Sequence, residues 1–450
     1  MVKFYDTLPN GSYRLTRMEA PVSLCIRSLS ISAALAILVL AACSTPAVTG
    51  VKVHIQNGEY LEAIHLADSV IAAGESQNAE LWMWRGKAQG NIRDWTGASE
   101  SFQQVARLDP AMAPQLEEYW FVFYNAAAVS LDSGDVAAAR SYLEAGRNAV
   151  PVRPEFDQML GDLAVQEGDY ETALTHFTAS ADISREYVAG LGAMLESAPA
   201  DQKPAIEEIL ANAESTFLLS LYNAGMIHKA LAGMSDTEEA SAAHLDGAVE
   251  VLEEAVGIDP TNADVLNLLA QVFLLRGSYD EAMAVFDDAL AGVDAGLAEG
   301  WLAPEDAQAI RGEIMLTRGA ALLEMERYSE AVTELEAARN VTGPSYVLLG
   351  NLAQAYIMQE EYDSAMAVLD EAAGLPDLSD EERANTLYMK FAALNQLERD
   401  AEAASALEAA LAINPDNAEW WEYLASTYSR LNRRGDAIEA MEHAQQLRGE

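Results

Sequence analysis

The side chains that most often hold metal ions are scattered in this sequence of 450 residues. A zinc site needs several converging ligands, as in the H-E-x-x-H pattern, and that pattern does not occur. No histidine has another histidine or a cysteine at ligand spacing on one predicted helix. The sequence therefore predicts no metal site, and we interpret the histidines as surface or partly buried residues. They are His54, His65, His176, His228, His244 and His443.

Motifs that carry catalysis or bind phosphate are also missing. The segment Gly190-Leu191-Gly192 is too short for a phosphate loop and precedes no predicted strand. Neither G-x-x-x-x-G-K-[ST] nor G-x-S-x-G occurs. Acidic pairs such as Asp287-Asp288 are expected on solvated helix faces, because the chain has 71 acidic residues. We therefore predict that the protein is not an enzyme, has no catalytic residues and uses no cofactor.

Cys43 near the N-terminus lies in a segment with the features of a cleaved targeting sequence. Basic residues precede an apolar run at 31–42, which is too short for a membrane-spanning helix of about 20 residues. Leu40-Ala41-Ala42-Cys43 resembles the lipobox of bacterial lipoproteins. The resemblance implies cleavage before Cys43, lipid attachment to its thiol, and a lipoprotein signal peptide at 1–42 that starts at Met1 or Met18. The alternative is an ordinary signal peptide in which the cysteine has no role.

Cleavage at this position would leave Cys43 as the single cysteine, since Cys25 lies in the removed segment. The mature chain would then have no internal disulfide. Ser44 follows the cysteine, and in the lipoprotein pattern an Asp there often signals retention in the inner membrane. We therefore expect a lipid-anchored protein of the bacterial cell envelope, at the outer membrane and facing the periplasm.

The rest of the chain has a helical repeat. Ala, Leu and Glu are abundant, and runs of alternating β-branched residues are absent, so we expect helices and almost no sheet. An alanine that opens the second helix of each predicted pair recurs along the chain, four times with a spacing of 34 residues. These alanines are Ala63, Ala98, Ala139, Ala173, Ala248, Ala282, Ala331, Ala365, Ala403 and Ala437.

This spacing, together with Trp82, Gly86, Phe102 and Pro110 around Ala98, resembles the tetratricopeptide repeat. The resemblance implies an all-α, tetratricopeptide-type α-solenoid, a right-handed superhelix of antiparallel helix pairs with the first helices on its concave face. Short helices of this kind depend on stacking against their neighbours. We expect a small residue of each first helix to face the alanine of the second helix.

The predicted array divides the chain as follows. We expect a signal peptide at 1–42, a tether and the start of the first helix at 43–57, and about 10–11 helix pairs at 58–450. One pair near 186–214 is degenerate, and insertions near 231–241 and 292–306 are expected to be loops. The last second helix has many polar residues, and we interpret it as the end of the stack, exposed on its outer side.

The resemblance also predicts a peptide-binding groove. In the family, a position in the first helix often holds an Asn that can bond an extended peptide backbone. The candidate groove residues at or beside that position are Asn125, Asn223, Asn351, Tyr124, Tyr222, Gln354 and Tyr388. These residues can equally be repeat consensus. The aromatic run 119–124 is interpreted as core, with contact to a partner as the alternative.

Charge restricts the partners. The formal net charge is −44, so the chain would repel nucleic acid and anionic lipid, and the lipid anchor is the expected membrane contact. We predict a membrane-anchored scaffold for protein–protein interactions in the cell envelope, with an extended peptide or a helix in the concave groove. The alternative is a glycan- or muropeptide-sensing regulator of a periplasmic cell-wall enzyme.

Overall fold

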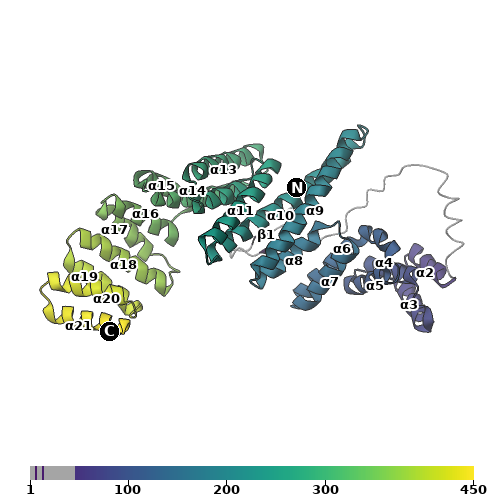
Figure 1. The fold of residues 1–450 in the computed structure, drawn as a ribbon, viewed down its shortest axis with the longest axis horizontal. Helices are drawn as coiled ribbons and strands as arrows, with labels where there is room; N and C mark the ends of the chain where they lie inside the picture. The colour runs from purple at the N-terminus through teal and green to yellow at the C-terminus, as the bar shows by residue number, and fades with distance from the viewer. Residues whose placement is uncertain (1–5, 8–12, 15–45, 450) are drawn as a thin grey trace. The chain divides into compact units, whose positions relative to one another are not determined.

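The computed structural model describes residues 6–7, 13–14 and 46–449, and nearly all of this range is helical (Figure 1). The exception at the N-terminus is a pair of two-residue strands, β1 (Asp6–Thr7) and β2 (Tyr13–Arg14), which pair in antiparallel register. The expected all-α solenoid of helix pairs is confirmed. The apolar run of the predicted signal peptide and Cys43 lie outside the described residues.

The chain divides into two compact units, Met1–Thr237 and Glu238–Glu450, which we describe separately. The N-terminal unit contains four antiparallel helix pairs followed by α10, and each helix contacts the next. Its helical elements are α2 (Pro46–Gln56), α3 (Tyr60–Val70), the π-helical turn η1 (Ile71–Glu75), α4 (Ala79–Asn91), α5 (Trp95–Leu108), the 3₁₀ helix η2 (Pro110–Tyr119), α6 (Trp120–Asp132), α7 (Val136–Ala149), α8 (Pro154–Gln166), α9 (Tyr170–Ser197) and α10 (Lys203–Met234).

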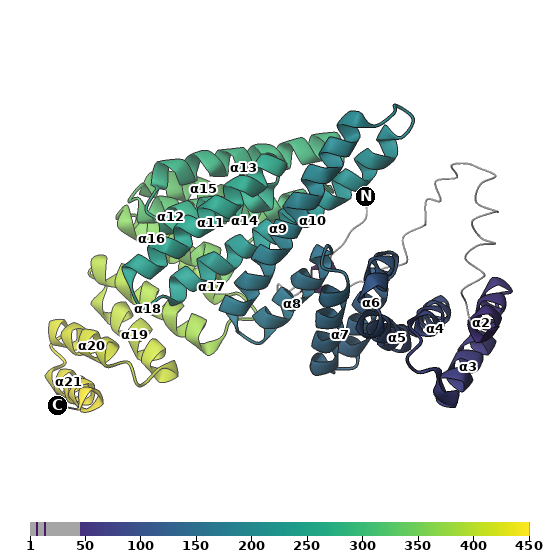
Figure 2. The same ribbon diagram turned by 45° about the vertical axis from the view of Figure 1, so that its right-hand side comes forward.

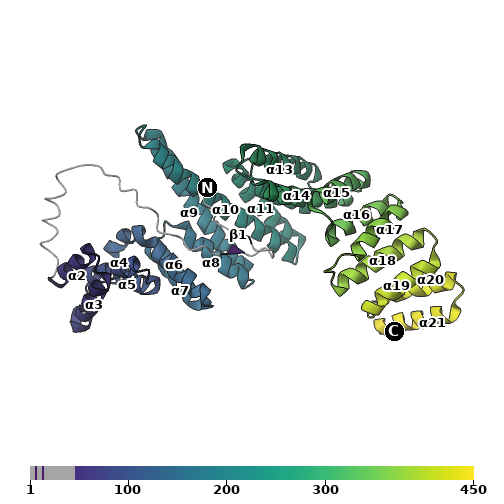
Figure 3. The ribbon, with the colours of Figure 1, turned by 180° about the vertical axis from the view of Figure 1, so that it is seen from behind.

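The C-terminal unit begins with α11 and continues through five antiparallel pairs, α12–α13 to α20–α21. The pairs follow one another side by side in Figures 1 and 3. The helices are α11 (Glu238–Ile258), α12 (Ala263–Leu275), α13 (Tyr279–Glu299), α14 (Pro304–Glu324), α15 (Tyr328–Thr342), α16 (Tyr346–Met358), α17 (Tyr362–Ala373), α18 (Asp380–Gln396), α19 (Asp400–Ile413), α20 (Ala418–Arg430) and α21 (Arg434–Arg448).

The turn inside most pairs contains one residue in the left-handed conformation. Glycine occupies this position at Gly134, Gly168 and Gly277. In the last pair the residue is Asn432, with φ 59°, and Gly435 lies inside α21 rather than in the turn. A left-handed residue reverses the chain after the first helix, and glycine or asparagine adopts it at the lowest cost.

The predicted repeat register is confirmed by burial. Nine of the ten alanines have no exposed surface, and only Ala437 in the last pair is partly exposed. The small residue of the first helix, however, faces a different partner from the one expected. A Cβ added to Gly86 would lie 2.5 Å from the Phe102 ring, and one on Gly161 would lie 2.6 Å from the Phe177 ring. The glycines therefore make room for a large side chain one helical turn after the alanine.

The degenerate pair expected near 186–214 is not a separate pair. Residues 186–197 are the end of α9 and 203–214 belong to the start of α10, so one long antiparallel pair forms, whose tips extend beyond the neighbouring helices (Figures 1 and 2). Leu191, Ile206 and Ala213 are buried between the two helices or against the unit. The extension is helical because it is rich in Ala, Leu and Glu and can bury these apolar residues.

The two predicted insertions are also mostly helical. Only residues 235–237 separate α10 from α11, and only residues 300–303 separate α13 from α14. Gly292 and Gly296 lie inside α13, where both are buried. A Cβ on Gly292 would lie 2.3 Å from the carbonyl oxygen of Thr261, so this glycine permits a close approach of two backbones rather than a loop.

Candidate binding surfaces

In the N-terminal unit, two of the predicted groove amides are buried. The Asn125 side chain on α6 donates from Nδ2 to the Phe121 carbonyl oxygen at 2.8 Å, and its Oδ1 is enclosed without a hydrogen-bond partner. Asn223 on α10 is also buried with an unpaired Oδ1. Their neighbours Tyr124 and Tyr222 are half-buried. A ligand could reach these amides only if the covering side chains moved.

The aromatic run at 119–124 packs mainly into the core. Trp120 is buried, with its ring 6.0 Å from that of Tyr124 and 6.4 Å from that of Phe156. Phe123 also lies 6.4 Å from Phe156, in an edge-to-face arrangement. The Arg153 guanidinium lies 5.1 Å from the Trp120 ring. These contacts join α6 to α8, and the interpretation of the run as core is confirmed.

The first helix α8 carries three carboxyl groups of low exposure that the sequence analysis did not select, the buried Asp157 and the half-buried Glu155 and Asp162. Burial raises the pKa of the Asp162 carboxyl to about 7. Burial also raises the pKa of Glu155, whose Oε2 has no hydrogen-bond partner. Low solvent exposure disfavours the charged form of a carboxyl group. The sequence could have indicated Asp162, because it directly follows Gly161, a residue at a close contact between two helices.

The predicted groove residues of the C-terminal unit are better placed for a ligand. Asn351 and Gln354 lie on α16, and Tyr388 lies on α18, which contacts α16. Asn351 is half-buried and Gln354 is exposed. Neither amide makes a side-chain hydrogen bond to another described residue. Both can therefore donate and accept hydrogen bonds to a bound chain without breaking an existing one.

Four aromatic rings of α18 and α20, including that of Tyr388, contact one another. The Tyr388 ring stacks on Trp420 at 5.1 Å and lies 6.2 Å from Tyr423, which is 5.9 Å from Phe391. We call Tyr388, Phe391, Trp420 and Tyr423 the aromatic row. The sequence analysis found Tyr388 but not the other three, because their convergence depends on how α18 packs against α20.

The hydroxyl group at the end of this row is held neutral. Tyr423 donates a hydrogen bond to Glu419, one turn earlier on α20. This bond, followed by burial and the charge of Glu419, raises the pKa of Tyr423 to about 12. The Tyr423 ring therefore stays uncharged over the whole ordinary pH range.

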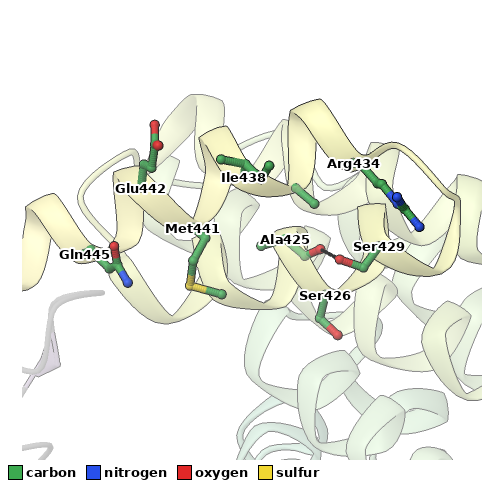
Figure 4. Close-up of a pocket in the computed structure, with 9 residues that line it drawn as sticks. Ala425, Ser426, Ser429, Arg434, Ile438, Met441, Glu442 and Gln445 are labelled. Carbon is green, nitrogen blue, oxygen red and sulfur yellow. Dashed lines mark hydrogen bonds between the residues drawn. The ribbon is translucent and has the colours of Figure 1, made fainter.

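The last helix pair has a groove that the sequence analysis missed. The groove has a volume of about 530 Å³ and lies between α20 and α21 (Figure 4). The helix α21, interpreted as the exposed end of the stack, exposes Ile438, Met441 and Leu447 besides its polar residues. The count of polar residues on α21 did not show that Ile438 and Met441 lie beside small residues of α20.

Two kinds of site are absent from the described part of the chain. Between residues 46 and 449 and in the two short strands, no group of three His, Cys, Asp or Glu side chains is placed to hold a metal ion. No described helix combines the length and the apolar character needed to cross a membrane.

Comparison with protein families identifies the repeat. Tetratricopeptide repeat models match residues 49–113, 124–187, 240–295 and 316–379. These segments make up more than half of the sequence, and the chain belongs to the tetratricopeptide repeat family. Repeats of this family are typically non-catalytic scaffolds for protein–protein interactions, and the paired helices described above have that architecture.

Similar solved structures are all distant. MamA (residue 41 to its end) from Desulfovibrio magneticus RS-1 is 18% identical, with 42% of this chain and 95% of that chain covered at a TM-score of 0.35. YrrB, described as a tetratricopeptide repeat protein with an unusual peptide-binding site, is 19% identical, with 45% of this chain and 94% of that chain covered at a TM-score of 0.35. The Cut9–Hcn1 structure is 14% identical, with 92% of this chain and 90% of that chain covered at a TM-score of 0.37. No curated protein matches the sequence.

Proposed function

We propose that the chain is a lipid-anchored scaffold of the bacterial cell envelope that binds segments of other proteins on the C-terminal unit. The proposed binding surface consists of Asn351, Gln354 and the half-exposed rings of Tyr388 and Tyr423. The other two rings of the row, Phe391 and Trp420, are buried and support these two from the core. The observation that carries this proposal is that Asn351 and Gln354 on α16 make no side-chain hydrogen bond to another described residue, while α16 contacts α18, which carries the half-exposed Tyr388.

The chemistry of this surface suits a polypeptide. Side-chain amides pair with the N–H and C=O groups of an extended backbone, and aromatic rings bury large areas at a low entropy cost. The chain as a whole is strongly acidic, with a formal net charge of −44, so the bound segment should be neutral or basic. Tetratricopeptide repeat membership supports a protein ligand in general, and this surface is where we propose that the ligand binds.

Attachment to the membrane is the second part of the proposal. The sequence from 31 to 43 supports an acyl anchor at Cys43, with the repeats facing the periplasm from the outer membrane. The substitution Cys43→Ser should release the protein into the soluble fraction of lysed cells. Unchanged sedimentation with membranes would contradict the anchor and leave the binding surface untouched.

A photo-crosslinking amino acid tests the binding surface directly. Placed at Gln354 in the full chain in cells, it should capture the same one or few proteins repeatedly. The matched control is Gln396 on α18, which is also exposed and outside the proposed surface. Equal capture from both positions, or only abundant background from Gln354, would remove the support for this site. Stabilisation of the purified protein by muropeptides would instead favour the regulator alternative.

A further inference from the structure

The helix α21 exposes two neighbouring apolar side chains that no other described residue of the C-terminal unit covers. Ile438 is 60% exposed and Met441 39%. Ile438 and Met441 line the groove between α20 and α21 together with small residues such as Ala425 and Ser426 (Figure 4). A cluster of exposed apolar side chains beside a groove is a common feature of protein interfaces.

The preceding helix pair, α18–α19, shows which element packs against the equivalent surface there. The positions 34 residues before Ile438, Met441 and Gln445 are Ala404, Leu407 and Leu411 on α19. These three are 1%, 0% and 3% exposed, because α20 packs against α19. The groove on α21 therefore has the form of a surface that accepts one more helix.

The charges around the groove restrict the occupant. Within the described residues, Arg434 and Glu442, which both line the groove, form no ion pair. The other three arginines of this helix pair are bonded, Arg430 to Asp400 at 2.7 Å, Arg433 to Asp436 at 2.6 Å and Arg448 to Glu422 at 2.9 Å. The groove thus offers one free positive and one free negative side chain, about 12 Å apart along α21 at 1.5 Å per residue.

The helix pair that forms the groove is also nearly neutral. Residues 418–449 contain four arginines and five acidic residues, whereas the whole chain has a net charge of −44. A strongly cationic partner would find more negative surfaces elsewhere on the protein. A second copy of this acidic chain, in contrast, would meet little repulsion at this end.

We propose that the occupant of the groove is the same face of a second copy, so that two α21 helices pack antiparallel about a two-fold axis. If the axis passes between Ile438 and Met441, Ile438 of one copy packs on Met441 of the other. Arg434 then lies opposite Gln445 of the second copy, and Glu442 of that copy is one turn away, about 4.5 Å along the helix. The two free charges pair in both directions, as a two-fold interface requires.

Ionic strength should affect this dimer in a characteristic way. The apolar contact is insensitive to screening, while repulsion between the two acidic bodies falls as the Debye length shortens from about 10 Å at 0.1 M to about 3 Å at 1 M salt. Dimerisation should therefore strengthen as salt is added. Binding of a cationic partner to the same chain should weaken under the same change.

Sedimentation velocity of the full chain in non-ionic detergent tests the proposal. Over about 1 to 100 µM protein the wild type should pass from monomer to dimer, with a Kd on the order of 10 µM for so small an interface. Ile438→Glu should weaken the dimer at least about tenfold, because it places two carboxylates at the axis. Met194→Glu on α9 is the matched control, since Met194 is 53% exposed and far along the chain from the groove.

A charge exchange tests the antiparallel arrangement separately. Arg434→Glu alone should weaken the dimer several-fold, and Arg434→Glu combined with Glu442→Arg should restore it. Far-ultraviolet circular dichroism confirms that each variant is folded, and Met441→Lys replaces Ile438→Glu if that variant is not. A monomer at all concentrations, a dimer unaffected by the α21 variants, open-ended oligomers or failure of the double exchange would each overturn the proposal.

Discussion

The close contact between α8 and α9 can be tested with a single methyl group. Gly161→Ala would place a Cβ 2.6, 2.8 and 2.9 Å from three atoms of the Phe177 ring. Ordinary carbon–carbon contacts are about 3.5–4.0 Å, and Phe177 is 2% exposed, so its ring has no free space to enter. Either the ring or one of the two helices must therefore shift.

Two opposing effects determine the size of the change. Replacing a helical glycine by alanine gains about 0.5–1 kcal/mol, because the unfolded chain loses freedom. Overpacking a buried contact costs about 1–3 kcal/mol. We therefore expect Gly161→Ala to lower the free energy of unfolding by about 0.5–2 kcal/mol.

A matched variant isolates the packing effect. Gly190 is also inside a helix of the N-terminal unit, but a Cβ there meets nothing within 4 Å. Gly190→Ala should therefore stabilise α9 by about 0.5–1 kcal/mol. Adding Phe177→Leu to Gly161→Ala should give a cost below the sum of the two single substitutions, since the smaller side chain relieves the overlap.

The assay must resolve single helices, because repeat arrays can unfold in parts. Urea unfolding followed by circular dichroism gives the total change, and amide hydrogen exchange locates it in α8 and α9. If Gly161→Ala were as stabilising as Gly190→Ala, the close approach of α8 to the Phe177 ring would be wrong.

Two further predictions concern titration and helix capping. Asp162→Asn should raise the free energy of unfolding at pH 8 by up to about 4 kcal/mol. At this pH the folded wild type must carry a charged Asp162 in a poorly solvated position, where its pKa is about 7, and the variant avoids this cost. Wild-type stability should then fall between about pH 4 and 7, and the variant's should fall less, because Asp162 no longer titrates while Glu155 still does. Melting temperatures across this range would show the difference, and parallel pH profiles would contradict the raised pKa of Asp162. Ser379→Ala should cost about 1 kcal/mol, because Ser379 Oγ accepts from the Glu382 N–H at 3.2 Å and the Glu382 carboxylate accepts from the Ser379 N–H at 2.8 Å. Hydrogen exchange should show the first turn of α18 opening more often, whereas unchanged protection there would argue against the capping box.

Local residue patterns were a good guide to the repeat and a poor guide to its interruptions. The alanine register followed from spacing, because it reflects contacts inside one helix pair. The segments near 186–214, 231–241 and 292–306 were assigned as a separate pair and as loops, but they lengthen existing helices. Their glycines were read as chain breaks, whereas Gly292 is a packing contact with the Thr261 backbone.

For the candidate binding surfaces, too, the sequence identified some residues but not their exposure. The sequence selected Asn125, Asn223 and Asn351 by one shared position, yet the first two are buried and the third is half-buried. The difference arises because exposure of a side chain depends on the neighbouring helices rather than on its own repeat. Asn351, Gln354 and Tyr388 were identified from the sequence, but Phe391, Trp420 and Tyr423 were not.

The amino-acid sequence by itself determined the helix pairs, their register and the family, because a 34-residue spacing repeats the same contacts in every pair. Only the tertiary structure decided which repeated positions remain open. In α19 the positions equivalent to Ile438 and Met441 are closed by α20, while in α21 they are exposed. Burial of a side chain is a property of the whole stack, and one repeat cannot specify whether another helix will cover it.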